Sequence, residues 1–178
     1  MGSRPGANGG NRIGTKVTWH EPNARERLEL MKNSVNVAIV GASDNPSRAS
    51  YFVSTYLMSA SHFKLFFVNP RLETLLGQPV YKSLADIPEP IDIVDVFRKS
   101  EDIPGVLDEA IAIKAKAFWM QLGIKHQESA ERAAAAGMTV IQDRCLKIEH
   151  ARFHGGLHLA GFNTGVISSN RNAKRGQS

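Results

Sequence analysis

The chain of 178 residues is long enough for one domain with a sizeable hydrophobic core. Its hydrophobic content of 42% and charged content of 22% are ordinary for a globular protein, and its single cysteine excludes an internal disulfide. No apolar run approaches the ~18–20 residues of a membrane span. Because the N-terminus lacks the apolar core of a signal peptide, we expect a cytoplasmic protein with no membrane contact.

The formal net charge of +5 lies in the two ends of the chain. Residues 1–33 carry six Lys/Arg against three Asp/Glu, residues 151–178 carry four against none, and residues 34–150 carry twelve against fourteen. This distribution argues against nucleic acid as a partner of the folded body. It also divides the chain into an N-terminal arm with a short helix (1–33), a central domain (34–150) and a basic, polar C-terminal tail (151–178).

In chain order, short apolar runs alternate with segments of helical periodicity. Strands are expected at 35–40, 64–68, 91–96, 117–121 and 138–141. Helices are expected at 22–32, 47–60, 100–116 and 126–136 and in a last short segment ending near 150, with one capped turn at 83–86. The alternation predicts an α/β fold: a single Rossmann-like, doubly wound, parallel five-stranded sheet with helices on both faces.

The first strand of the sheet ends in a glycine turn at Gly41. Ser43, Asp44 or Asn45 can cap the helix that follows. Pro46 suits the first turn of that helix. A strand, a glycine turn and a helix N-terminus place backbone N–H groups at a positive helix end, which is a typical phosphate site. The full dinucleotide fingerprint is absent, because Ser43 and Pro46 stand where its second and third glycines belong.

The second strand is followed by Asn69-Pro70-Arg71, with no acidic residue before Glu73. An NAD site uses an acidic residue there for the ribose hydroxyl, whereas an arginine attracts a ribose phosphate. The pattern favours a nucleotide with an extra ribose phosphate, and NADP and coenzyme A (CoA) both fit. Arg48, just inside the first helix of the sheet, is a second candidate for phosphate. For both arginines, the alternative is a solvated surface side chain.

Six motifs occur together in the central domain. They are Val-Gly-Ala-Ser-Asp-Asn-Pro-Ser-Arg (40–48), Phe-Val-Asn-Pro-Arg (67–71), Tyr-Lys-Ser-Leu-Ala-Asp-Ile-Pro (81–88), Val-Asp-Val-Phe-Arg (94–98), Trp-Met-Gln-Leu-Gly (119–123) and Asp-Arg-Cys-Leu-Lys-Ile-Glu-His (143–150). In this combination, residues 34–150 resemble the small stand-alone CoA-binding proteins. These are relatives of the CoA-binding domain of the succinyl-CoA synthetase alpha subunit.

The resemblance implies that CoA or an acyl-CoA binds at the carboxyl ends of the strands. It assigns the pyrophosphate to Gly41, Ala42 and Ser43, and the adenosine with its phosphate to Asn69, Pro70 and Arg71. It places Val96, Phe97 and Arg98 beside the adenine or the pantetheine, and Met120, Gln121 and Gly123 along the pantetheine. The phospho-histidine of the synthetase lies in a second domain, which we do not expect in this chain.

Two further clusters raise the question of metal binding or catalysis. His150, His154 and His158 are spaced four apart near Cys145, but two glycines interrupt the helix between the second and third histidine. We therefore expect solvated, loop-borne histidines and no metal. Cys145 follows the cation Arg144, which can activate a thiol, although a buried, inert cysteine is the favoured interpretation.

The acidic residues Asp92 and Asp95 lie three apart within one predicted strand, so their side chains should point to opposite faces. They therefore do not form a convergent catalytic pair, and we expect them to cap neighbours or to bond backbone amides.

These observations predict non-catalytic binding of CoA or an acyl-CoA, in a sensor or carrier module; NADP is the less favoured ligand. One alternative is an NADP- or acyl-CoA-dependent enzyme, for which Cys145 is the only candidate nucleophile. Another is an interaction protein that docks through its basic ends. The pattern leaves open whether the chain forms a homo-oligomer or has a protein partner.

Overall fold

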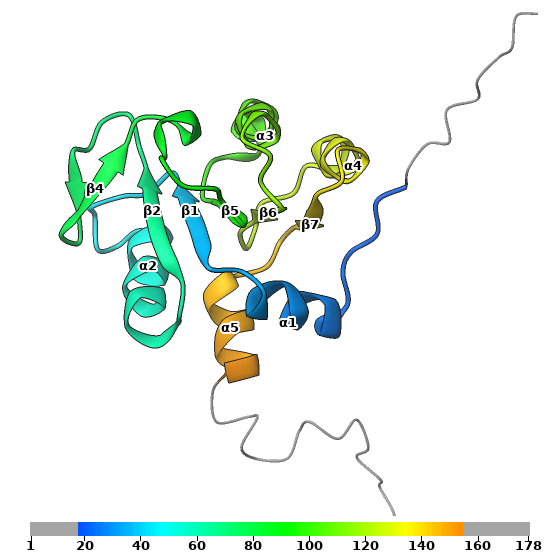
Figure 1. Ribbon diagram of the computed structural model, residues 1–178, viewed down its shortest axis with the longest axis horizontal. Helices are drawn as coiled ribbons and strands as arrows, with labels where there is room; N and C mark the ends of the chain where they lie inside the picture. The colour runs from blue at the N-terminus through cyan, green and yellow to red at the C-terminus, as the bar shows by residue number, and fades with distance from the viewer. Residues whose placement is uncertain (1–17, 155–178) are drawn as a thin grey trace, which may run out of the picture.

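A computed structural model describes residues 18–154, which form one mostly parallel sheet of seven strands (Figure 1). The strand order is β3-β4-β2-β1-β5-β6-β7. The strands are β1 (Asn36–Val40), β2 (Lys64–Val68), β3 (Thr74–Leu75), β4 (Gln78–Tyr81), β5 (Ile93–Val96), β6 (Ala117–Met120) and β7 (Thr139–Ile141). The predicted α/β, doubly wound fold is confirmed.

Helices cover both faces of this sheet. One face carries α1 (Ala24–Lys32), α2 (Ala49–Ala60) and α5 (Leu146–His154), and the other carries α3 (Ile103–Ala112) and α4 (Gln127–Ala135) (Figure 1). Two 3-10 turns, η1 (Leu84–Asp86) and η2 (Ser100–Asp102), precede β5 and α3. Within residues 18–154, every helix is too short or too polar to cross a bilayer.

The apolar runs form strands because both faces of the sheet are buried. In β1, Ala38 and Val40 pack into the core under α3 and α4, while Val37 and Ile39 pack into the core on the opposite face. A strand with helices on both sides needs apolar residues at every position instead of at alternate ones. β1 therefore reads as a continuous hydrophobic run, and it lies at the centre of the sheet.

Seven strands replace the predicted five, because β3 and β4 form an antiparallel hairpin beside β2. The loop between them consists of Leu76 and Gly77, both with positive φ (49° and 75°). Two consecutive positive φ values identify a type I′ hairpin turn, which Asn-Gly or Asp-Gly usually provides. With a leucine in the first position, the turn carries no strong sequence signal, and the predicted strands include none between 64–68 and 91–96.

The helix boundaries differ most from the prediction around α3 and α5. The helix expected over 100–116 is the turn η2 followed by α3, which ends at Ala112. Ser100 therefore does not cap this helix, since its N-cap residue is Asp102. The helix expected to end near 150 continues to His154, and the rest of the predicted tail, including His158, lies outside the described residues.

The histidines of α5 are not solvated loop residues as predicted. His150 is 2% exposed, its Nδ1 lies 3.2 Å from the Tyr56 hydroxyl, and its ring stacks on that of His154 at 4.5 Å. Burial, together with the neighbouring His154 and His62, lowers the pKa of His150 to about 4. Within residues 18–154, no group of three His, Cys, Asp or Glu side chains has the geometry of a metal site.

Candidate nucleotide site at the carboxyl edge of the sheet

The sheet topology defines one switch point. The chain leaves β1 through α2 to β2 on one side, and β5 on the other side of β1 leads through α3 to β6. The two crossovers therefore cover opposite faces, and ligands of open α/β sheets bind outside the carboxyl ends of the strands at such a point. We call the region outside the carboxyl ends of β1 and β5 the crevice. The segments that follow Val40, Val68, Val96 and Met120 meet at this edge, as the predicted site requires.

Gly41 is needed at the end of β1 for two reasons. Its φ of +83° lies in the left-handed region that favours glycine. A Cβ atom at this position would also lie 3.2 Å from the carbonyl carbon and oxygen of Phe97 and 3.1 Å from Cδ of Arg98. The turn after β1 is thus pressed against the segment after β5, and this contact sets the floor of the crevice.

The backbone amides of the glycine turn are not directed at a ligand. The N–H groups of Gly41 and Ala42 both donate to the carbonyl oxygen of Val68, at 3.1 and 3.3 Å. These two amides hold β1 and β2 together at the edge and are therefore not free to donate to a phosphate. A contact of Gly41, Ala42 and Ser43 with the pyrophosphate stays a prediction. A phosphate at this turn must take its donors from residues further along the chain.

The open donors lie at the N-terminus of α2. Its N-cap residue is Arg48, which has extended φ/ψ and makes no capping hydrogen bond with its side chain. Ser43 and Asn45 instead accept hydrogen bonds from the amides of Asn45 and Ser47, at 3.2 and 2.9 Å, and the predicted capping of the helix by residues 43–45 is wrong. The first amides of α2, those of Ala49 and Ser50, therefore have no acceptor among the described residues.

Two arginines near these amides lack an ionic partner. Arg48 and Arg71 are both exposed, and neither forms a salt bridge within residues 18–154, whereas Arg98 pairs with Asp102 at 3.1 Å. Two unpaired cations and a positive helix end at one edge of a sheet attract polyanions.

Asn69 and Pro70 sit between these cations and the sheet. The Asn69 side chain donates to the carbonyl of Ala42 at 2.6 Å and accepts from the amide of Arg71 at 2.8 Å. It therefore braces the loops after β1 and β2 against each other, which gives it a structural task besides any ligand contact. Pro70 is exposed beside it.

On the β5 and β6 side, the predicted residues divide into core and crevice. Val96 and Met120 are 0% exposed, so their side chains cannot reach a ligand, and this part of the predicted site is wrong. Phe97 is half-buried and Gly123 is exposed. The Gly123 amide donates to Oδ1 of Asp143 at 2.7 Å, and this bond, together with Lys125, lowers the pKa of Asp143.

The environment of Asp95 differs from the one expected from its position in the strand. Asp92 bonds the amides of Val35 and Asn36 as expected, at 2.8 and 2.9 Å, but Asp95 bonds no backbone amide. It is 0% exposed, and both carboxyl oxygens accept from Nε2 of Gln121, at 2.8 and 2.9 Å. Burial raises the pKa of Asp95 to about 8. A fully enclosed carboxyl cannot touch a ligand, but it can act through Gln121.

Cys145 is half-buried, not fully buried as favoured from the sequence. The neighbouring Arg144 forms an ion pair with Glu21, and its carbonyl accepts from the Trp119 indole at 2.7 Å. The reactivity of the thiol stays a prediction.

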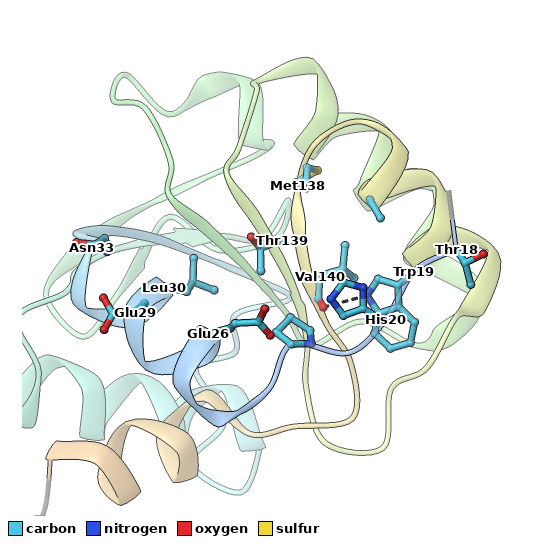
Figure 2. Close-up of a pocket in the computed structure, with 12 residues that line it drawn as sticks. Thr18, Trp19, His20, Glu26, Glu29, Leu30, Asn33, Met138, Thr139 and Val140 are labelled. Carbon is cyan, nitrogen blue, oxygen red and sulfur yellow. Dashed lines mark hydrogen bonds between the residues drawn. The ribbon is translucent and has the colours of Figure 1, made fainter. Parts of the chain in front are cut away.

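A cavity of about 580 Å³ lies away from this edge, between α1, the segment 18–22 and the amino end of β7 (Figure 2). The Trp19 indole lines this cavity and donates to the Val140 carbonyl at 3.1 Å. Glu26 and Glu29 also line it. Two carboxylates and no arginine or lysine make it unsuited to a polyanion, so the crevice is the better candidate for the nucleotide.

The fold and the carboxyl-edge crevice are those of a nucleotide-binding α/β domain, and comparison with known proteins specifies which kind. Residues 35–151 match the CoA binding domain family, so the chain belongs to this family. The matched range covers the whole sheet and the first two thirds of α5. The resemblance read from the motifs is confirmed.

Relatives of two kinds share this domain. An uncharacterized protein of Bacillus subtilis (strain 168), YneT, is 40% identical over 130 residues, which are 73% of this chain and 96% of the relative. A hypothetical protein from Pyrococcus horikoshii OT3 superposes with a TM-score of 0.71 at 32% identity, covering 75% of this chain and 94% of that one. The 4-hydroxybutyrate–CoA ligase (ADP-forming) of Nitrosopumilus maritimus (strain SCM1) is 25% identical over 123 residues, 64% of this chain but only 18% of the ligase.

Proposed function

We propose that this protein binds CoA or an acyl-CoA in the crevice at the carboxyl edge of its sheet and carries out no chemistry on it. The observation that supports the proposal most is that Arg48 and Arg71, at the same sheet edge as the uncapped N-terminus of α2, have no ionic partner within residues 18–154. CoA carries a pyrophosphate and a separate ribose phosphate, which match one helix end and two separate cations. The family membership supports the same ligand.

In this arrangement, the order of the strands orients the ligand. The pyrophosphate lies on the amides of Ala49 and Ser50, and the ribose phosphate lies on Arg71 after β2. The pantetheine then runs towards Gln121 after β6, because β2 and β6 lie on opposite sides of β1. A non-catalytic role is supported by the burial of Asp95. Burial raises the pKa of this carboxyl group, but the group is 0% exposed and cannot contact a ligand.

The role of Arg71 distinguishes this proposal from general anion binding. Arg71→Ala should weaken CoA about tenfold or more by calorimetry, because charge-assisted hydrogen bonds to phosphate are strong. The same change should alter the affinity for 3′-dephospho-CoA by less than about twofold, since that ligand lacks the ribose phosphate.

Arg132→Ala is the matched control, because Arg132 is a surface arginine on α4 paired with Asp108 and lies outside the crevice. Equal losses for the two ligands would show that Arg71 does not contact the ribose phosphate. Binding of NADP with no binding of CoA would refute the choice of ligand.

A further inference from the structure

The Asp95–Gln121 pair is the most deeply buried polar contact at the carboxyl edge. Asp95 lies on β5 next to Ile39 of β1 and Trp119 of β6. Among the described residues, its only hydrogen-bond partner is Nε2 of Gln121, the first residue after β6. The arrangement joins the floor of the crevice to the segment along which the pantetheine runs in the proposed function.

The Gln121 side chain is held at one end only. Its Nε2 donates to Asp95, whereas its Oε1 makes no hydrogen bond to a described residue. Within residues 18–154, the only fully enclosed side-chain polar atom without a partner is Oγ of Ser129. The Gln121 Oε1 atom is therefore not fully enclosed, and it belongs to the 4% of this residue that reaches the surface.

We propose that Asp95 is a positioning residue, which holds the carboxamide of Gln121 so that Oε1 faces the crevice as a hydrogen-bond acceptor for an amide N–H of the pantetheine arm. This inference rests on the proposed function and specifies a contact that gives it selectivity for the arm. Asp95 never touches the ligand. It acts by occupying Nε2, so that the opposite end of the carboxamide is the one presented.

The chemistry of the two groups matches this role. Pantetheine contains two secondary amides, and each offers one N–H donor to a correctly oriented carbonyl oxygen. A glutamine with both ends free can turn either end outward, and a ligand then has to select one orientation at an entropic cost. A carboxylate removes this freedom, because both of its oxygens are acceptors and pair only with Nε2. The neutral acid also carries an O–H donor, which would pair with Oε1 instead, so Asp95 selects this orientation in its ionised form. No charged side chain contributes to the pKa shift of Asp95.

The test compares two ligands by calorimetry with the full chain, above the pKa of Asp95, where its carboxyl group is ionised. One ligand is CoA, and the other is 3′-phospho-ADP, which is CoA without the pantetheine arm. Gln121→Met removes the acceptor, and Asp95→Leu removes the group that orients it. Each variant should weaken CoA about five- to tenfold, the effect of one lost hydrogen bond, and should leave 3′-phospho-ADP unchanged. The double variant should bind CoA no more weakly than Gln121→Met alone, because Asp95 acts only through Gln121.

Asp92→Asn is the matched control, since Asp92 is the other buried acid of this segment but lies before β5, at the opposite edge of the sheet. If Asp95→Leu does not fold, Asp95→Asn replaces it. Its side chain offers Gln121 both a donor and an acceptor and so no longer selects Nε2, and CoA should weaken while 3′-phospho-ADP stays unchanged. Losses shared equally by both ligands, or no loss for either variant, would overturn the positioning role. If the wild-type protein binds neither ligand, the proposed function is refuted instead.

Discussion

Asp95 makes the stability of the protein depend on pH. Its pKa in the folded state is about 8, against an ordinary value of 3.8, because burial disfavours the charged form. Between these values the unfolded chain has lost the proton and the folded chain has kept it. The free energy of unfolding therefore falls as pH rises through this window, and the loss is complete once pH exceeds the folded pKa.

We expect wild type to lose roughly 2 kcal/mol of stability between about pH 6.5 and pH 8 through this group, at ~1.4 kcal/mol per pH unit. Asp95→Asn has no proton to release and should lack this decrease. Urea denaturation of both proteins across the window measures the difference. Parallel pH profiles for wild type and Asp95→Asn would show that Asp95 does not keep its proton in the folded protein.

Helix α2 lacks a stabilising side-chain cap, so its first amides can bind a ligand instead. A helix N-terminus normally has an Asp, Asn, Ser or Thr cap, but Arg48 stands there and supplies no capping bond. The candidate caps 43–45 are used in the turn that precedes the helix. The helix end is thus left for a ligand oxygen, which would satisfy the same amides as a cap does.

Arg48→Asp tests whether a side-chain cap and a phosphate compete for the same amides of α2. An aspartate at the N-cap should stabilise the protein by about 0.5–1 kcal/mol relative to Arg48→Ala, and it should weaken CoA at least about tenfold, because its carboxylate competes for the amides and repels phosphate. Denaturation and calorimetry on the two variants provide both numbers. Arg48→Ala serves as the control that removes the cation without adding a cap. Identical CoA affinities for the two variants would mean that phosphate does not sit on this helix end.

At the scale of the whole molecule, hydrophobic patterning sufficed to predict the class of fold. β1, β2, β5, β6 and β7 read as continuous apolar runs because helices cover both faces, and that pattern is visible in one sequence. The hairpin β3–β4 was missed because its I′ turn begins with Leu76, a residue that rarely adopts positive φ.

The candidate site was predictable only at the level of loops. Strand ends identified the segments around Gly41, Arg71 and Gln121, but hydrogen-bond partners depend on tertiary contacts. Local sequence could not show that the Val68 carbonyl accepts from the amides of Gly41 and Ala42. It also could not show that Asp95 on β5 bonds Gln121 at the end of the neighbouring strand β6. Burial of Val96 and Met120 likewise follows from the cover that α3 and α4 provide.

In the proposed complex, CoA lies across the carboxyl edge with its pyrophosphate on α2. Amide chemical shifts of the full chain, followed by NMR as CoA is added, locate the bound ligand. We expect the largest changes at the amides of Ala49 and Ser50, with smaller ones near Arg71 and Gln121 and none around Trp19 and Thr139 in the cavity of Figure 2. Changes concentrated at Trp19 and Thr139, with Ala49 and Ser50 unmoved, would contradict it.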